Sequence, residues 1–266
     1  MRITVNGKVM EGPWKTVYEV PVDPKRKVIR ILNGFQIEKN VPLQEGDILN
    51  VIPKGIMPDQ QELESMMAAR HTPHVHECVK KAKVGIAGLG GLGSHIAIML
   101  ARTGVGKLVC ADFDEVEPSN LNRQSYFVRD LGTPKAEALT KQIQEINPFI
   151  QVESHAVRVT AQNAAALFSG CDVVCEAFDR PRQKAMLVNT ILDQLPGVKV
   201  IASSGMAGYD SSNQIETRRV MKNLYICGDL VSEAQIGNGL MAPRVEICAG
   251  HQANMVLRLL LGIEDV

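Results

Sequence analysis

The sequence predicts an α/β protein in which a doubly wound, mostly parallel sheet of the Rossmann type, with one antiparallel edge, follows a small β-rich N-terminal domain. Beyond residue 83, short apolar segments alternate with segments of helical periodicity, and repeated βα units of this kind build a mostly parallel sheet. A Gly-x-Gly-x-x-Gly sequence at residues 88–93 stands where the first of these strands gives way to a helix. Residues 1–56 consist instead of short strand patterns separated by turn residues.

The N-terminal domain is expected to span residues 1–56. Residues 2–5 alternate in character, and the Asn-Gly pair that follows them favours a two-residue hairpin turn. Residues 28–32 and 47–52 are predicted as two further strands, each closed by turn residues. This region is either a domain with a role of its own or a β-rich extension that only packs on the main domain.

A helical connector is expected over residues 57–83, with its helix at residues 62–70, and the main domain over residues 84–266. The last two strands of the main domain have no helix between them, so we expect them to pair antiparallel at an edge of the sheet. The expected strands are residues 84–87, 107–111, 151–157, 172–176, 198–202, 214–220 and 223–227, and the expected helices are residues 94–102, 134–146, 162–168 and 182–195.

Composition and charge exclude several classes of partner. The 29 Lys and Arg residues balance the 29 Asp and Glu residues, so the chain lacks the bulk positive field that holds nucleic acid or an anionic membrane. The first residues lack the features of an export signal, and no apolar stretch is long enough to span a bilayer. The six cysteines form no Cys-x-x-Cys pair, which fits reduced thiols and argues against zinc. We therefore expect a cytoplasmic protein without zinc, nucleic acid or membrane partners.

The glycine motif predicts a nucleotide site. Glycines permit the tight turn and let a phosphate group approach the backbone amides at the start of the helix, where the helix dipole also attracts anions. Asp112 lies 19 residues after the motif, at the tip of the next strand, where a carboxylate can hold ribose hydroxyls. These features alone favour an NAD dehydrogenase, and the alternative is a glycine turn with no ligand. The nucleotide-binding glycines are Gly88, Gly90, Gly91 and Gly93.

A polar loop at residues 112–124 changes this balance. It lies beyond the carboxyl end of a strand, over the expected nucleotide crevice, and a dehydrogenase has no evident need for it. Isolated polar residues fit a solvated loop. That interpretation explains poorly why Asn120, Arg123 and then Lys135, in the first turn of the next helix, should all face a phosphate site.

The loop resembles the ATP-binding signature of the ThiF, MoeB and ubiquitin-activating-enzyme superfamily, and the later sequence resembles the ThiF-type members most closely. The resemblance covers residues 84–201 and includes Gly-x-x-Lys at residues 132–135, Ile-Asn-Pro at residues 146–148 and Ala-Phe-Asp-Arg at residues 177–180. It implies that ATP is contacted by Gly91, Asp112, Ser119, Asn120, Arg123, Lys135 and Asp179.

The resemblance also implies that Asp179 binds magnesium, an ion that prefers one or two carboxylates together with phosphate oxygens and water. Pro181 stands where a first-turn proline would, so an alternative role for Asp179 is to cap that helix. Arg123 and Lys135 would balance the phosphate charge, and Asn120 would be a neutral donor. Such charge compensation is what a carboxylate needs when it attacks the α-phosphate of ATP.

Residues 1–56 resemble the ThiS and MoaD sulfur carriers, which have the β-grasp fold of ubiquitin. The chain departs from these carriers at two points. Residues 15–27, with Pro21 and Pro24, are too short and too broken for the full helix of a β-grasp. Carriers end in a free Gly-Gly, whereas here Gly55 continues into Ile56, so the fused module has no terminal carboxylate to activate.

Two further residues were considered for catalysis. In family members an arginine from a preceding helix reaches across a dimer to the partner's ATP, and Arg70 is the nearest match to it in this sequence. The alternative is that Arg70 is an exposed arginine at a helix end. Cys227 is the best-placed thiol for a covalent link to a carrier, and the alternative is a buried cysteine at a strand end.

The function expected from this resemblance is an ATP-dependent adenylyltransferase. It would activate the C-terminal glycine of a ThiS-like carrier ending in Gly-Gly, for thiamine-thiazole synthesis. Alternatives are a related enzyme acting on a MoaD-like carrier, small-molecule or tRNA carboxylate, and a non-catalytic carrier-like scaffold. The resemblance implies a homodimer, and the C-terminal helix, with Val245, Cys248, Val256 and Leu259, carries more apolar surface than one face needs to bury.

Overall fold

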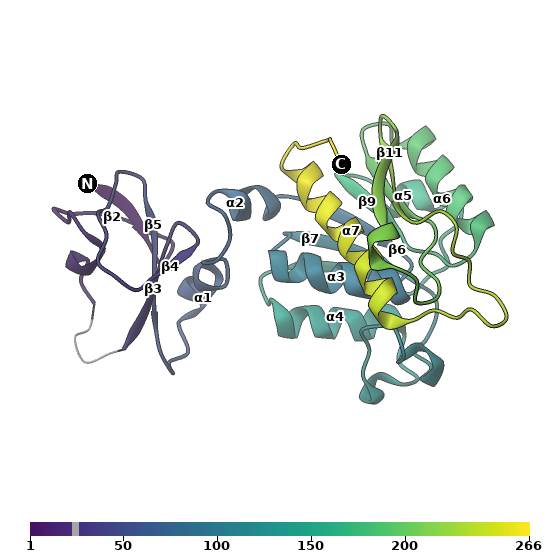
Figure 1. The fold of residues 1–266 in the computed structure, drawn as a ribbon, viewed down its shortest axis with the longest axis horizontal. Coiled ribbons are helices and arrows are strands. Elements are labelled where there is room, and N and C mark those ends of the chain that lie inside the picture. The colour runs from purple at the N-terminus through teal and green to yellow at the C-terminus, as the bar shows by residue number, and fades with distance from the viewer. Residues whose placement is uncertain (23–26) are drawn as a thin grey trace. The chain divides into compact units, whose positions relative to one another are not determined.

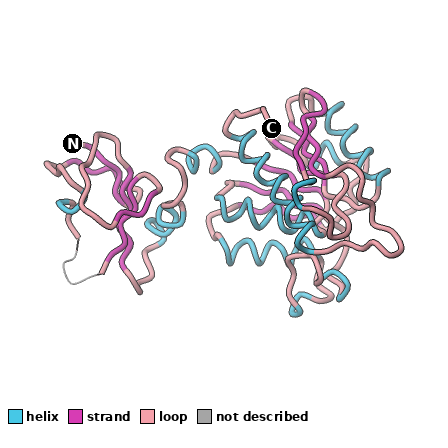
Figure 2. Tube along the Cα trace, viewed as in Figure 1, coloured by secondary structure: helices cyan, strands magenta, loops and turns pink. Residues whose placement is uncertain are grey.

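The structure, a computed structural model, describes residues 1–22 and 27–266. The chain forms two compact units, Met1–Glu77 and Cys78–Val266, whose elements are traced in Figures 1 and 2. The helix that we assigned to a connector belongs to the first of these units.

The first unit is built on a five-stranded sheet with the order β2-β1-β5-β3-β4. The expected hairpin is present, and Asn6 and Gly7 both have positive φ, 47° and 79°. Strand β1 runs parallel to β5, while the other neighbours pair antiparallel. The strands are β1 (Arg2–Val5), β2 (Lys8–Glu11), β3 (Val28–Leu32), β4 (Phe35–Ile37) and β5 (Ile48–Pro53).

Both faces of this sheet are covered. One face packs on a small core that includes Val17 of the 3-10 turn η1 (Val17–Glu19), which is the only helical structure in the described part of residues 15–27; Pro24 lies outside the described residues. On the other face, Ser65 of helix α1 (Gln60–Met67) donates a hydrogen bond to Asn50 at 3.0 Å. The connector helix therefore serves as a second layer for the sheet. A short helix, α2 (Val75–Val79), follows it.

The second unit is a seven-stranded sheet with the order β11-β12-β10-β9-β6-β7-β8. All neighbouring strands are parallel except β11 and β12. The predicted doubly wound sheet with one antiparallel edge is thus confirmed. The strands are β6 (Lys83–Ala87), β7 (Lys107–Ala111), β8 (Gln151–His155), β9 (Val173–Glu176), β10 (Lys199–Ser203), β11 (Glu216–Met221) and β12 (Leu224–Gly228).

Helices cover both faces of the second sheet (Figure 1). On one face α3 packs against both α4 and α7. On the other, α5 and α6 pack together over a core that includes Phe168 and Leu187. The helices are α3 (Gly91–Thr103), α4 (Lys135–Ile146), α5 (Ala164–Leu167), α6 (Pro181–Gln194) and α7 (Ala242–Leu260).

The strand order places a switch point between β6 and β9. From β6 the chain adds β7 and β8 on one side, then crosses to β9 and β10 on the other. Loops from the carboxyl ends of the strands diverge at such a point and leave a crevice for a ligand.

The C-terminal helix does not offer the surplus apolar surface that we expected. Val245, Cys248 and Val256 are buried within the second unit, with exposed fractions of 2%, 0% and 0%, and α7 makes its largest contact with α3. Leu259 is partly buried. Val245, Cys248 and Val256 are therefore taken up by packing against α3 and the sheet, and the homodimer stays a prediction. Within the described residues, no helix has the length and apolar character needed to cross a membrane.

A candidate active site at the carboxyl ends of the strands

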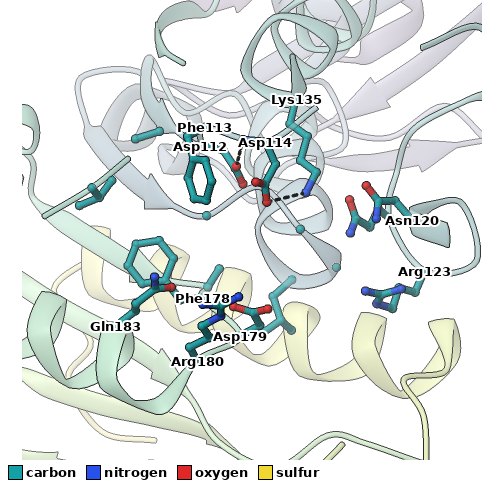
Figure 3. A pocket seen from close by; sticks show the side chains of 18 of the residues that line it. Asp112, Phe113, Asp114, Asn120, Arg123, Lys135, Phe178, Asp179, Arg180 and Gln183 are labelled. Carbon is teal, nitrogen blue, oxygen red and sulfur yellow. Dashed lines mark hydrogen bonds and ion pairs between the residues drawn. The ribbon is translucent and has the colours of Figure 1, made fainter. Parts of the chain in front are cut away.

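A cavity of about 430 Å³ opens where β6, β7 and β9 end. Its walls come from the glycine turn, the loop after β7, the start of α4 and the turn between β9 and α6 (Figure 3). Of the predicted site residues, those that line it are Gly88, Gly90, Gly91, Asp112, Asn120, Arg123, Lys135 and Asp179.

The glycines have two distinct roles. Gly88 has a φ of 87°, and a Cβ atom there would stand 2.8 Å from the carbonyl oxygen of Ala177. Gly93 does not line the cavity; a Cβ atom on it would stand 1.8 Å from the carbonyl oxygen of Gly88. Gly93 therefore lets α3 pack on the turn. Gly90, where a Cβ atom would meet nothing closer than 3.8 Å, leaves the amides at the start of α3 accessible to an anion.

Asp112 holds the glycine turn in addition to facing the cavity. Its carboxylate accepts hydrogen bonds from the backbone N–H groups of Leu89, at 2.6 Å, and Asp114, at 2.8 Å. Burial raises the pKa of Asp112, and these two N–H groups and the Lys135 ammonium partly offset that effect. The sequence predicted a ribose-binding role but not this structural one.

Lys135 is the buried cation of the site. It is 6% exposed, and its ammonium lies 3.4 Å from the carboxylate of Asp114. Figure 3 shows this pair beside Asp112. Asp114 was missed as a site residue, although the Asp-x-Asp spacing at residues 112–114 could have indicated it.

Asn120 and Arg123 lie together on a second wall. Asn120 ends the 3-10 turn η2 (Pro118–Asn120), where its side-chain oxygen accepts a hydrogen bond from the N–H of Glu117 at 3.1 Å. The guanidinium of Arg123 donates to the carbonyl oxygen of Ser119 at 3.1 Å. Ser119 is exposed and does not line the cavity. Its backbone carbonyl oxygen supports Arg123, and the expected contact of Ser119 with ATP stays a prediction.

The first turn of α3 holds this loop in place, a role that the sequence did not reveal. His95 donates to the carbonyl oxygen of Arg123 at 3.1 Å and contacts the hydroxyl of Ser125 at 2.9 Å. The hydroxyl of Tyr126 donates to the carbonyl oxygen of Leu89 at 2.8 Å. The loop that carries Arg123 is thus fastened to both the glycine turn and the helix after it.

Asp179 is exposed on the cavity wall that Phe178 and Arg180 also form (Figure 3). The N-cap of α6 is Arg180, and no side chain makes a capping hydrogen bond there. The alternative role of Asp179 as a helix cap is therefore absent. Its side chain is thus available to the cavity.

A buried arginine orders the two loops that close the remaining side, where Met206 and Leu240 line the cavity. Arg244, at 3% exposure, donates to the carbonyl oxygen of Ala207 at 2.7 Å and to the carboxylate of Asp229 at 2.6 Å. Burial alone would raise the pKa of Asp229. Hydrogen bonds from Ser232 and two backbone N–H groups, together with the guanidinium of Arg244, lower it to about 2.

Two further residues were predicted to be catalytic, Cys227 and Arg70. Cys227 is completely buried in β12, and burial raises the pKa of its thiol to about 11. It is the buried strand-end cysteine of our alternative, since a carrier cannot reach a fully buried thiol. Arg70 belongs to the first unit, where it donates to the side chain of Gln36 at 2.5 Å. Among the described residues, no three His, Cys, Asp or Glu side chains are grouped to hold a metal ion.

Comparison with protein families identifies the larger part of the chain. The model of the ThiF family matches residues 64–266, which is more than half of the sequence. The chain belongs to the ThiF family. A second model, described as ThiS-like ubiquitin, matches residues 1–55 of this ThiF-family protein. Both resemblances seen in the sequence are confirmed.

Curated relatives of this ThiF-family chain include named adenylyltransferases. The sulfur carrier protein adenylyltransferase of Thermus thermophilus is 40% identical over 108 residues, covering 40% of each chain. The adenylyltransferase and sulfurtransferase UBA4 of Yarrowia lipolytica is 29% identical over 190 residues, covering 70% of this chain and 47% of that protein. The chain spans less than half the length of these relatives. These relatives are thus named for the enzyme class that we expected, adenylyltransferase.

Solved structures show the same fold. The Escherichia coli tRNA N6-threonylcarbamoyladenosine dehydratase, determined in complex with ATP, superposes with a TM-score of 0.68 and 22% identity, over 78% of this chain and 97% of that one. The E. coli protein MccB superposes with a TM-score of 0.57 and 20% identity, over 79% of this chain and 73% of that one.

Proposed function

We propose that this ThiF-family protein is an ATP-dependent adenylyltransferase that activates the C-terminal glycine of a ThiS-like sulfur-carrier protein. The observation that supports this most is the convergence of Arg123, Lys135 and Asp179 on the cavity beside the glycine turn. These residues come from three separate elements. Their charges suit a reaction in which a carboxylate attacks a phosphate and pyrophosphate leaves.

The chemistry requires that several negative charges be held close together. The attacking carboxylate and the triphosphate repel one another, so alignment and charge compensation supply most of the catalysis. In this proposal the amides at the start of α3 and the cations Arg123 and Lys135 bind phosphate oxygens, with Asn120 as a neutral donor. Asp112 holds the ribose. The leaving pyrophosphate stays paired with the two cations until it dissociates.

Magnesium fits the donor set at the cavity. Asp179 offers an exposed carboxylate on the wall. Asp114, which also lines the cavity and pairs with Lys135, offers a second carboxylate. One or two carboxylates together with phosphate oxygens are what this ion prefers. Bound there, it would neutralise phosphate charge.

The acceptor is proposed to be a carrier ending in Gly-Gly because two observations agree. The T. thermophilus relative is named a sulfur carrier protein adenylyltransferase, and the first unit of this chain matches a ThiS-like model. Thiamine-thiazole synthesis is the pathway proposed for that carrier. We also propose a cytoplasmic homodimer, as the resemblance implies. A monomer found by light scattering at micromolar concentration would contradict the homodimer.

A second candidate acceptor is a tRNA carboxylate, because the tRNA threonylcarbamoyladenosine dehydratase of E. coli is 34% identical over 145 residues, covering 54% of this chain and 53% of that protein. The balance of 29 basic and 29 acidic residues argues against it, since proteins that hold RNA normally need a positive surface.

Release of pyrophosphate from ATP and magnesium tests the proposal, with each acceptor added in turn. We expect release with a carrier that ends in Gly-Gly and none with the same carrier amidated at its C-terminus. Release only with tRNA would favour the second candidate. A dehydrogenase would be stabilised against thermal unfolding by NAD and not by ATP.

A further inference from the structure

An ion pair brackets the turn that carries Asp179. Glu176 is the last residue of β9, and Lys184 lies at the start of α6. The ammonium of Lys184 donates to the two carboxylate oxygens of Glu176 at 2.9 and 3.1 Å, and to the hydroxyl of Ser203 at 2.8 Å. The side chain of Glu176 is 0% exposed and that of Lys184 is 23% exposed.

The carboxylate of Glu176 also binds the turn itself. It accepts the backbone N–H of Phe178 at 2.7 Å. Burial raises the pKa of Glu176, and the Lys184 ammonium is the first of the groups that offset this effect. The lysine therefore favours the charged form of this acceptor, whose side chain is fully buried.

The rest of the turn is set by the neighbouring strand and the glycine turn. The N–H of Ala177 donates to the carbonyl oxygen of Ala87, at the end of β6, at 2.9 Å. The carbonyl oxygen of Ala177 packs against Gly88. The hydrogen bonds of Ala177 and Phe178 fix the backbone just before Asp179. They therefore set the direction in which the chain enters Asp179, on the wall of the cavity (Figure 3).

We propose that Glu176 and Lys184 are positioning residues, whose ion pair holds the β9–α6 turn so that the carboxylate of Asp179 faces the cavity. A role in stability alone explains the pair poorly, because the cost of removing two charges from water offsets most of their attraction. Neither Glu176 nor Lys184 lines the cavity itself, so the pair acts on it through the backbone of Phe178 and through Asp179. The proposal rests on the proposed function only for the identity of the ion that Asp179 would hold.

Lys184→Met is the test, made in the full chain, with Lys199→Met as a matched control. Lys199 also forms an ion pair, with Glu264 at 2.6 Å, and its side chain is 20% exposed. It lies at the opposite end of β10 from the cavity. Two quantities are measured for each variant: hydrogen exchange of the backbone amides at residues 177–183 without nucleotide, and the magnesium concentration for half-maximal pyrophosphate release.

We expect faster amide exchange in this segment for Lys184→Met. Its magnesium requirement should rise about 10–100-fold, as is typical when a group that orients a metal ligand is lost. Lys199→Met should match the wild type in both measurements, and Lys184→Arg should recover part of the magnesium affinity. If Lys184→Met does not fold, the double variant Glu176→Gln with Lys184→Met removes both charges and takes its place.

Unchanged amide exchange in a folded variant would overturn the proposal. Faster exchange with an unchanged magnesium requirement would also overturn it, because the pair would then be purely structural. Failure of the proposed function gives a different result, since the wild-type protein would then release no pyrophosphate with any acceptor. In that case the positioning of the turn is tested by amide exchange in Lys184→Met, together with ATP binding measured by thermal shift.

Discussion

The carbonyl oxygen of Gly88 lies 1.8 Å from the position that a Cβ atom on Gly93 would occupy. The glycine turn and the first turn of α3 are therefore in direct backbone contact. A Cβ atom on Gly90 would meet only the side-chain nitrogen of Gln124, at 3.8 Å. Two glycines of one motif thus differ in purpose: Gly93 allows packing, and Gly90 leaves space for a ligand.

Substitution of these two glycines should separate the two purposes. Gly93→Ala must push α3 away from the turn, so we expect a loss of about 2–4 kcal/mol in the free energy of unfolding and no ATP binding. Gly90→Ala should unfold at the wild-type temperature but bind ATP more weakly, because its methyl group enters the cavity. Thermal unfolding with and without ATP measures both effects. An equal loss of stability in both variants would contradict this division of roles.

Asp179→Ala should abolish pyrophosphate release while the protein stays folded. The side chain is exposed and caps no helix, so its loss removes the proposed magnesium ligand and little stabilising contact. Asp193→Ala, an exposed aspartate further along α6, is the control. Circular dichroism checks the fold of both variants. Retained activity in Asp179→Ala would show that the magnesium ligand lies elsewhere.

The ion pair between Asp229 and Arg244 predicts a specific dependence of stability on pH. The pKa of Asp229 is about 2 in the folded protein, against about 3.9 in an unfolded chain. Its contribution is therefore present above pH 4 and is lost as the pH falls toward 2. We expect Asp229→Asn to be less stable than the wild type by about 1–2 kcal/mol at pH 7, and nearly equal to it near pH 2. Urea unfolding at several pH values measures this difference, and a constant difference across the range would refute the assignment.

The fused N-terminal module should never itself be adenylated. Activation requires a free C-terminal carboxylate, and the carbonyl group of Gly55 is already an amide to Ile56. Lys54 stands where a carrier would have its other glycine, whose lack of a side chain lets the tail pass through a narrow channel. Intact-mass analysis after incubation with ATP and magnesium checks this. A full-length species that gains one adenylate, or an adenylated fragment that ends at Gly55, would show that the chain is both carrier and activator.

The order of strands and helices was predictable because it depends on local pattern. Apolar periodicity located each βα unit, and the glycine motif marked the strand-to-helix junction that forms one wall of the cavity. The three-residue strand β4 was missed, since it is too short to show alternation. Expected helix 162–168 was longer than the observed α5 (Ala164–Leu167), because the residues before Ala164 form a turn that the side chain of Asn163 stabilises.

The sequence by itself determined the family, the sheet, and the residues that meet at the switch point, because strand order fixes where carboxyl ends converge. Only the tertiary structure decided what each side chain does there. It buried Cys227, left Ser119 outside the cavity lining, bonded Asp112 to the glycine turn and paired Lys184 with Glu176. The physical reason is that burial and hydrogen bonding depend on neighbours far away in the chain: Asp112 bonds to Leu89, 23 residues earlier, and Lys184 to Ser203, 19 residues later.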